Sequence, residues 1–319
     1  MPTVQVPPGV EGIVRLTELP DDNWRDRWTR IIVPAATKDR LLNFVLFALS
    51  HRAKTSDVGL GLHGLVILAG PPGTGKTTLA GGLADEAARV LDGGPLLFVD
   101  IDPHAFPSQL LGESQRAVSR LFERTIPDLA RRGHPLVVLI DEVEALAVNR
   151  SSASLETNPV DVHRATDALL SGVDQVSRTW PNVLFLATTN FRVGVDTAFL
   201  SRADLIEEIG LPGVDAVAAI LADTLAEVGA PVTSATAAPV AAGGASGDVG
   251  ADHGGAPASA GARWPEELVR LAARCVEAEL DARQVRKLVV RTASSSRALA
   301  LDPSSMTIAD VGAELARGA

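Results

Sequence analysis

Two short motifs in this sequence gather glycines, one lysine, hydroxyl groups and adjacent carboxylates at close spacing. The first fits the pattern G-x-x-x-x-G-K-S/T; with one flanking residue it comprises Gly70, Pro71, Pro72, Gly73, Thr74, Gly75, Lys76, Thr77 and Thr78. The second is a hydrophobic run that ends in Asp141 and Glu142. In this order, the pair predicts a site that binds a nucleoside triphosphate with Mg²⁺ and hydrolyses it.

The first motif lies between a predicted strand and a predicted helix. Residues 65–69 form an apolar run of buried-strand length, and residues 78–88 carry apolar side chains at helical spacing. The glycines allow backbone N–H groups to turn toward phosphates at the positive end of the helix. We expect Lys76 to reach the β- and γ-phosphates and the Thr77 hydroxyl to ligate Mg²⁺. The alternative is a turn without chemistry, which this context disfavours.

The paired carboxylates follow a second buried-strand run, residues 136–140, which is best placed centrally in a parallel sheet. Asp141 is expected to hold Mg²⁺, directly or through water, and Glu142 to act as general base toward the attacking water. The alternative is a plain helix cap, with Asp141 at the N-cap and Glu144 in the first turn.

A further polar residue, Asn190, follows the apolar run 183–188. In one sheet with the phosphate loop, the carboxyl end of this strand faces the γ-phosphate. Asn190 is therefore a candidate for positioning the attacking water, although a turn role is common for asparagine after a strand.

Composition sets the broad class. The chain has 319 residues, 46% of them hydrophobic, a formal net charge of −10 and a single cysteine. We expect a globular cytoplasmic protein with no membrane span and no signal peptide. The acidic balance argues against direct binding to nucleic acid, and one cysteine excludes an internal disulfide or a cysteine-based zinc site.

Periodicity divides the chain into parts. Residues 1–22 are proline-rich and are interpreted as a flexible arm. Residues 23–210 alternate helical and strand patterns, which predicts an α/β domain with a parallel sheet covered by helices on both faces. Residues 211–319 predict a small helical domain, interrupted by a disordered Ala/Gly-rich insertion at 230–262. The strand candidates are 65–69, 96–100, 136–140, 183–188 and 205–209.

Taken together, the phosphate loop, the Asp-Glu pair, Thr-Thr-Asn and the helical second domain resemble an AAA+ ATPase, a P-loop NTPase with a helical lid, over residues 23–319. Further blocks are similar to the pachytene-checkpoint ATPases, at residues 140–146, 195–204 and 281–288. Ala282 stands where that family has glycine.

This resemblance implies ATP and Mg²⁺ as cofactors and a homohexameric ring. It implies that Arg202 is an arginine finger entering the neighbouring subunit's site, and that Arg283 senses the nucleotide from the lid. Without the resemblance, residues 281–291 would read as a solvated basic helix face.

The resemblance also implies pore loops that grip a polypeptide. Residues 106–114 resemble pore loop 1, with Leu110 and Leu111 where the family often has an aromatic residue. Residues 149–162 would form pore loop 2. The alternative for 106–114 is an ordinary loop with a helix cap.

The pachytene-checkpoint ATPases remodel HORMA-domain proteins, and the bacterial members belong to CBASS anti-phage operons with a HORMA protein and a cyclic-oligonucleotide synthase. The resemblance thus implies a motor that unfolds part of a HORMA partner and dismantles its complex with the synthase. Alternatives are an unfoldase or chaperone for another protein, a DNA-linked clamp-loader-like ATPase, and a nucleotide switch without a motor cycle.

Overall fold

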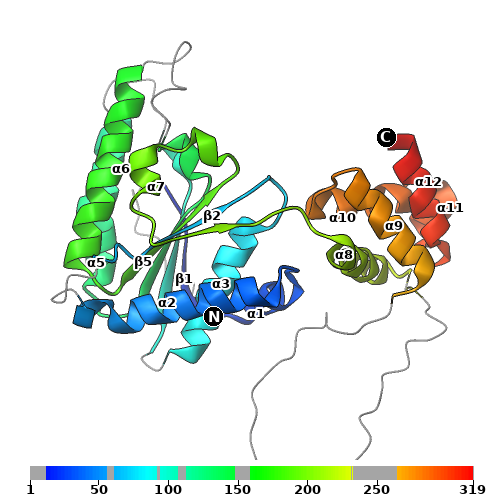
Figure 1. Cartoon of the computed structure of the whole chain (residues 1–319), viewed down its shortest axis with the longest axis horizontal. Coiled ribbons are helices and arrows are strands. Elements are labelled where there is room, and N and C mark those ends of the chain that lie inside the picture. Colours follow the sequence, from blue (N-terminus) through cyan, green and yellow to red (C-terminus); the bar gives the residue numbers. More distant parts are fainter. Residues whose placement is uncertain are drawn as a thin grey trace, which may run out of the picture. The chain divides into compact units, whose positions relative to one another are not determined.

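The computed structural model describes residues 12–55, 61–91, 94–106, 113–147, 159–230, 232 and 264–318. The chain divides into two compact units, Met1–Gly210 and Leu211–Ala319, drawn in Figure 1. Each unit is described by itself.

The large unit is built on a six-stranded sheet. Its strands are β1 (Ile13–Leu19), β2 (Leu65–Ala69), β3 (Leu96–Ile101), β4 (Leu136–Ile140), β5 (Val183–Thr189) and β6 (Leu205–Glu208). The spatial order is β1-β3-β4-β5-β2-β6, and every neighbouring pair is parallel except β1 with β3. This confirms the α/β prediction, and it places the ends of β4, β5 and β2 side by side.

Helices cover both faces of this sheet (Figure 1). One face carries α1 (Asp22–Arg30), α2 (Ala35–Thr55) and α3 (Lys76–Val90); the other carries α4 (Glu113–Arg120), α5 (Ile126–Ala130) and α6 (Pro159–Thr179). Alternate residues of a strand enter the two cores: Val137 and Leu139 join the first, Val138 and Ile140 the second. Burial on both faces explains why these strands read as unbroken apolar runs.

The expected flexible arm is corrected over the second half of its range. Ile13–Leu19 forms β1, which pairs antiparallel with β3, and Leu16 and Leu19 are almost fully buried. The prediction was wrong here because a short strand at a sheet edge gains its backbone partners from a remote segment, which periodicity does not show. Residues 1–11 lie outside the described residues.

The segment after β1 is fixed to α3, the helix that follows the phosphate loop. The Trp24 ring packs over Gly81 and meets Phe98 edge-on, with ring centroids 5.8 Å apart. The backbone N–H of Asp21 donates to the buried carboxylate of Asp85, with N and Oδ1 2.6 Å apart. The segment after β1 therefore helps to hold α3, and with it the phosphate loop, in position.

The small unit is helical. Its helices are α8 (Val214–Glu227), α9 (Glu266–Glu277), α10 (Ala282–Ala293), α11 (Arg297–Leu301) and α12 (Ile308–Gly318). Cys275 is fully buried on α9, and burial raises the pKa of its thiol to about 11, as fits a small core residue. Apart from Ala230 and Val232, the expected insertion at 230–262 lies outside the described residues.

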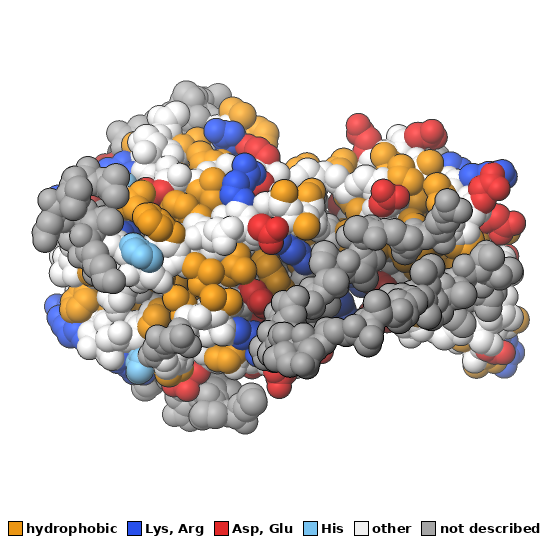
Figure 2. Space-filling view, turned by 60° about the horizontal axis from the view of Figure 1, so that its bottom comes forward, with side chains coloured by type: hydrophobic (Ala, Val, Ile, Leu, Met, Phe, Trp, Pro, Cys, Tyr) orange, Lys and Arg blue, Asp and Glu red, His pale blue; other side chains and the backbone are white. Residues whose placement is uncertain are grey.

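The surface shows no separation of charge by sign on the face drawn in Figure 2, where acidic, basic and hydrophobic side chains are mixed. In the part of the chain that the structure describes, no helix combines the length and apolarity needed to cross a membrane.

The contact of Trp24 with α3 yields a stability prediction. A Cβ on Gly81 would lie 2.2 Å from Cζ3 of Trp24, so Gly81→Ala forces the ring or the helix to move. Helix propensity alone would favour alanine by about 1 kcal/mol, whereas overpacking costs about 1–3 kcal/mol. We expect net destabilisation, measured by denaturant unfolding with tryptophan fluorescence. Gly210→Ala, whose Cβ would meet nothing within 4 Å, is the control; equal stability of wild type and Gly81→Ala would contradict the packing argument.

Candidate functional site

The phosphate loop has the backbone that anion binding requires. β2 ends at Ala69, and Gly70, Gly73 and Gly75 all have positive φ, at 148°, 78° and 88°. A Cβ on Gly70 would lie 2.0 Å from the carbonyl oxygen of Ile209, so this position needs glycine. The N-cap of α3 is Gly75, without a side-chain cap, so the first N–H groups of the helix are open to a phosphate.

Lys76 is held inside the loop. Its side chain is almost completely buried, and Nζ donates to the carbonyl oxygens of Gly70 and Pro71 at 2.9 and 2.8 Å. It also donates to Oδ1 of Asn190 at 2.8 Å. The lysine and asparagine predicted from separate motifs therefore lie in direct contact.

Asp141 meets the hydroxyl that follows the lysine. Thr77 Oγ1 donates to Asp141 Oδ1 at 2.8 Å, and the same oxygen accepts from the Thr188 hydroxyl. A hydroxyl and one carboxylate are the protein ligands that Mg²⁺ takes beside nucleotide phosphates, the rest of its shell being phosphate oxygens and water. The residues present thus fit a magnesium ion.

Glu142 is placed by its backbone as well as its partners. Its φ of 51° lies in the left-handed region, a strained state for a residue with a Cβ. Its N–H donates to the Thr188 hydroxyl at 2.9 Å, which holds the turn in place. The Thr188 hydroxyl therefore binds both acidic residues: it accepts from the backbone N–H of Glu142 and donates to the carboxylate of Asp141.

The carboxylate of Glu142 lies between two polar side chains. Asn190 Nδ2 donates to Oε1 and His104 Nε2 contacts Oε2, both at 3.0 Å. The hydrogen bond to His104 is the main cause that lowers the pKa of Glu142, with further lowering from Asn190 and from the charge of Lys76. The carboxylate is therefore ionised at neutral pH, as a proton acceptor must be.

Five residues predicted from sequence thus converge, namely Lys76, Thr77, Asp141, Glu142 and Asn190. His104 and Thr188 complete the group, and sequence reasoning assigned neither a role. Thr188 stood inside the Thr-Thr-Asn run. His104 follows the carboxyl end of β3, beside β4, in the short turn Pro103–Ala105, and only that strand order could have indicated it.

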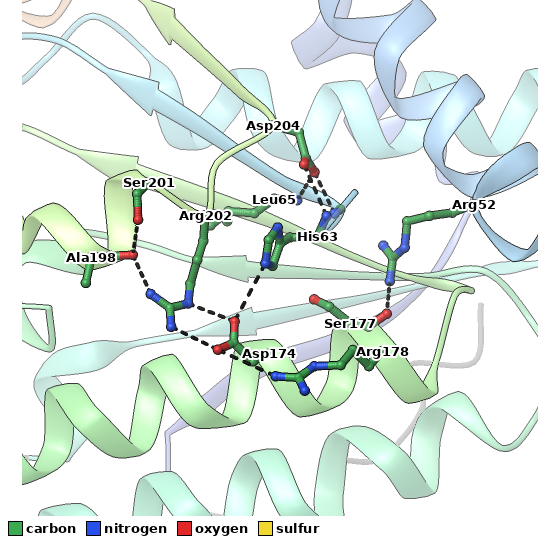
Figure 3. Close-up of polar contacts among 11 residues, drawn as sticks. Arg52, His63, Leu65, Asp174, Ser177, Arg178, Ala198, Ser201, Arg202 and Asp204 are labelled. Atoms are coloured by element: carbon green, nitrogen blue, oxygen red, sulfur yellow. Dashed lines mark hydrogen bonds and ion pairs between the residues drawn. The ribbon is translucent and has the colours of Figure 1, made fainter. Parts of the chain in front are cut away.

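Arg202 lies elsewhere, before the amino end of β6. Its Nε and Nη2 donate to Asp174 Oδ1 and Oδ2 at 2.7 and 2.9 Å, and Nη1 donates to the carbonyl of Ala198 at 2.6 Å (Figure 3). This ion pair lowers the pKa of Asp174 and raises that of Arg202. The parallel register pairs Ala69 with Glu208, so the phosphate loop lies at the other end of β6 from Arg202.

The remaining predicted residues lie apart from this group or outside the part of the chain that the structure describes. Arg283 is exposed in the first turn of α10, in the small unit, where Asp281 and Gln284 form a capping box. Phe106, the first residue of the predicted pore loop 1, is buried in the core of the large unit and not exposed to solvent. Leu110, Leu111 and residues 149–158 lie outside the described residues, and the side chains of 159–162, in α6, are not described.

The contact of His104 with Glu142 yields a kinetic prediction. His104→Ala removes the partner that orients the carboxylate, and loss of a hydrogen bond to a charged group should lower kcat for nucleotide hydrolysis about tenfold. Nucleotide affinity should stay within about twofold, because the side-chain hydrogen bond of His104 among the described residues is to Glu142 and not to the phosphate loop. Steady-state hydrolysis and fluorescent-nucleotide titration test this, with the exposed His51→Ala on α2 as control. Unchanged kcat would show that the contact has no catalytic part.

Comparisons with known proteins place this geometry in a family. Residues 66–211 match the model of the ATPase family associated with various cellular activities (AAA). CD-NTase-associated protein 6 of Pseudomonas aeruginosa is 46% identical over 211 residues, covering 66% of this chain and 69% of that protein. A pachytene checkpoint protein 2 homologue of Danio rerio is 35% identical over 202 residues, covering 62% of this chain and 47% of that protein. This chain thus matches about half the length of the pachytene relative.

Solved structures agree on the fold. Caenorhabditis elegans PCH-2 superposes with a TM-score of 0.69 at 25% identity, covering 96% of this chain and 75% of that chain. A chain in the structure of the E. coli MS115-1 HORMA:CdnC:Trip13 complex gives a TM-score of 0.71 over 98% of this chain and 97% of that chain. At 18% identity, the second likeness concerns the fold alone.

The phosphate loop, the ionised Glu142 and these relatives lead to one conclusion. The chain is an ATPase and belongs to the AAA family, together with CD-NTase-associated protein 6 and the pachytene checkpoint protein 2 homologues.

Proposed function

We propose that this ATPase is a cytoplasmic homohexameric motor that partly unfolds a HORMA-domain protein and dismantles its complex with a cyclic-oligonucleotide synthase in CBASS signalling. The observation that carries the proposal is the 46% identity with CD-NTase-associated protein 6. The fold shared with a chain of a HORMA:CdnC:Trip13 complex is compatible with this proposal. The net charge of −10 favours a protein partner over a nucleic acid.

In the proposed hydrolytic step, each group of residues at the site has its own role. The open N–H groups at the start of α3 and the Lys76 ammonium bind the β- and γ-phosphates. Thr77 and Asp141 would hold Mg²⁺, which would neutralise phosphate charge. The Glu142 carboxylate accepts a proton from the attacking water. Asn190 and His104 hold that carboxylate in line.

The position of Arg202 supports action between subunits. It lies at the opposite end of β6 from its own phosphate loop, and its side chain is turned to α6. An arginine placed there cannot reach the γ-phosphate of its own chain without rebuilding this end of the sheet. In a ring it would enter the neighbouring site and stabilise charge on the transferred phosphoryl group. Arg283, in the small unit, is the proposed sensor that couples nucleotide state to domain movement.

The proposal predicts ATP-dependent release. Any HORMA-domain protein and cyclic-oligonucleotide synthase encoded beside this gene are purified as a complex and mixed with the ATPase and ATP. We expect the HORMA protein to leave the synthase, measured by size-exclusion chromatography. Glu142→Gln should bind ATP and release nothing, since it keeps the shape of the site but lacks the proton acceptor.

A complex that stays intact beside active ATP turnover would overturn the HORMA assignment. It would favour a chaperone or unfoldase for another protein, as would neighbouring genes without a HORMA protein. DNA-stimulated turnover that falls steeply with salt would instead favour a DNA-linked ATPase. Normal function of Glu142→Gln would favour a nucleotide switch.

A further inference from the structure

We propose that Asp174 is a positioning residue that aligns Arg202 for the ATP site of the neighbouring subunit. The inference rests on the proposed function, in which Arg202 acts between subunits. It starts from the paired contact of the two side chains: one carboxylate accepts from Nε and Nη2 of a single guanidinium, at 2.7 and 2.9 Å (Figure 3). Such a two-point contact fixes the plane of the guanidinium as well as its place.

Some of the N–H donors of Arg202 are used by hydrogen bonds within its own chain, and the others are available to a partner. A guanidinium carries five N–H donors in a rigid fork. Among the described residues, Asp174 accepts two of them and the carbonyl of Ala198 accepts one. Two donors therefore remain, which is the number that a bidentate contact with phosphate oxygens uses. The Arg202 side chain is 23% exposed, so its own chain does not fully enclose it.

The two groups that accept from Arg202, the Asp174 carboxylate and the Ala198 carbonyl, belong to helices packed on the core. Asp174 belongs to α6, where Val173 and Val176 are buried in the core. The Ala198 carbonyl belongs to α7 (Thr197–Leu200), which the fully buried Phe199 anchors. An arginine side chain that is free to rotate loses rotamer entropy when it binds a phosphate, and a guanidinium already held in place loses less.

The other charges around Asp174 are weaker partners. His63 Nε2 lies 3.8 Å from Oδ1, and Arg178 Nη2, on a highly exposed side chain, lies 3.9 Å from Oδ2. The neighbouring Asp204 faces the opposite way, because its carboxylate accepts the backbone N–H groups of residues 63–65 at the start of β2 (Figure 3). Asp204 thus supports the strand, whereas Asp174 holds the arginine.

The test uses rings of two kinds of subunit. Glu142→Gln subunits have a dead site but keep Arg202, and Arg202→Ala subunits keep a complete site but lack the arginine. Each alone should be nearly inactive. Co-expressed with different tags and purified by tandem capture, they should recover ATPase activity, because a Glu142→Gln subunit lends its arginine to an Arg202→Ala neighbour. No recovery would contradict the proposed function itself.

Asp174→Asn is then added to one kind of subunit at a time. In the Glu142→Gln subunit, which lends the arginine, it should lower the recovered kcat about tenfold and leave KM for ATP within about twofold, since the arginine serves the transition state. In the Arg202→Ala subunit, which lends none, the recovered rate should stay within about twofold. Asp174→Glu in the lending subunit keeps the charge and should restore part of the loss.

These placements separate positioning from folding. A variant that merely disturbed the fold or the ring would lower the rate from either subunit. Equal losses from both placements, or no loss from the lending subunit, would overturn the role of Asp174 while leaving the action of Arg202 between subunits intact. The matched control is Asp128→Asn on α5, an exposed carboxylate paired with Arg131, which should change neither mixture.

Discussion

The amide of Asn190 stands between a positive and a negative side chain, and the candidate site depends on this placement. Its oxygen accepts from Lys76 and its nitrogen donates to Glu142. A lysine and a glutamate in direct contact would form an ion pair and satisfy each other. The neutral amide contacts both groups instead, and in the proposed hydrolytic step this leaves the Lys76 ammonium available to phosphate and the Glu142 carboxylate available to water.

This placement requires the order of the strands. Asn190 follows β5, which lies between β4, the strand before Asp141 and Glu142, and β2, the strand before the phosphate loop. Parallel strands bring their carboxyl ends to one edge, so a side chain after the middle strand can touch groups from both neighbours. Thr188, near the end of the same strand, adds hydrogen bonds of its hydroxyl with the Glu142 backbone N–H and the Asp141 carboxylate.

The amino end of β6, opposite the end that carries the phosphate loop, holds a different pair of charged residues. There Asp174 and Arg202 form an ion pair on α6 and the turn before β6, at the far end of the strand from the phosphate loop. In the proposed ring, each chain would contribute the phosphate-loop part of one site and the arginine of the next. In the proposed ring, hydrolysis therefore depends on contact between subunits, which suits a motor that has to coordinate its subunits.

The α/β class, the phosphate loop and the Asp-Glu pair could be predicted from the sequence, because each is marked by a short-range pattern of neighbouring residues. Tertiary structure alone decided the edge strand β1, the roles of His104 and Thr188, and the pairing of Asp174 with Arg202. Each of these joins segments distant in the chain, and isolated residues carry no periodicity or motif that marks them. Their chemistry arises only when the folded sheet and its helices bring their polar atoms within hydrogen-bond distance.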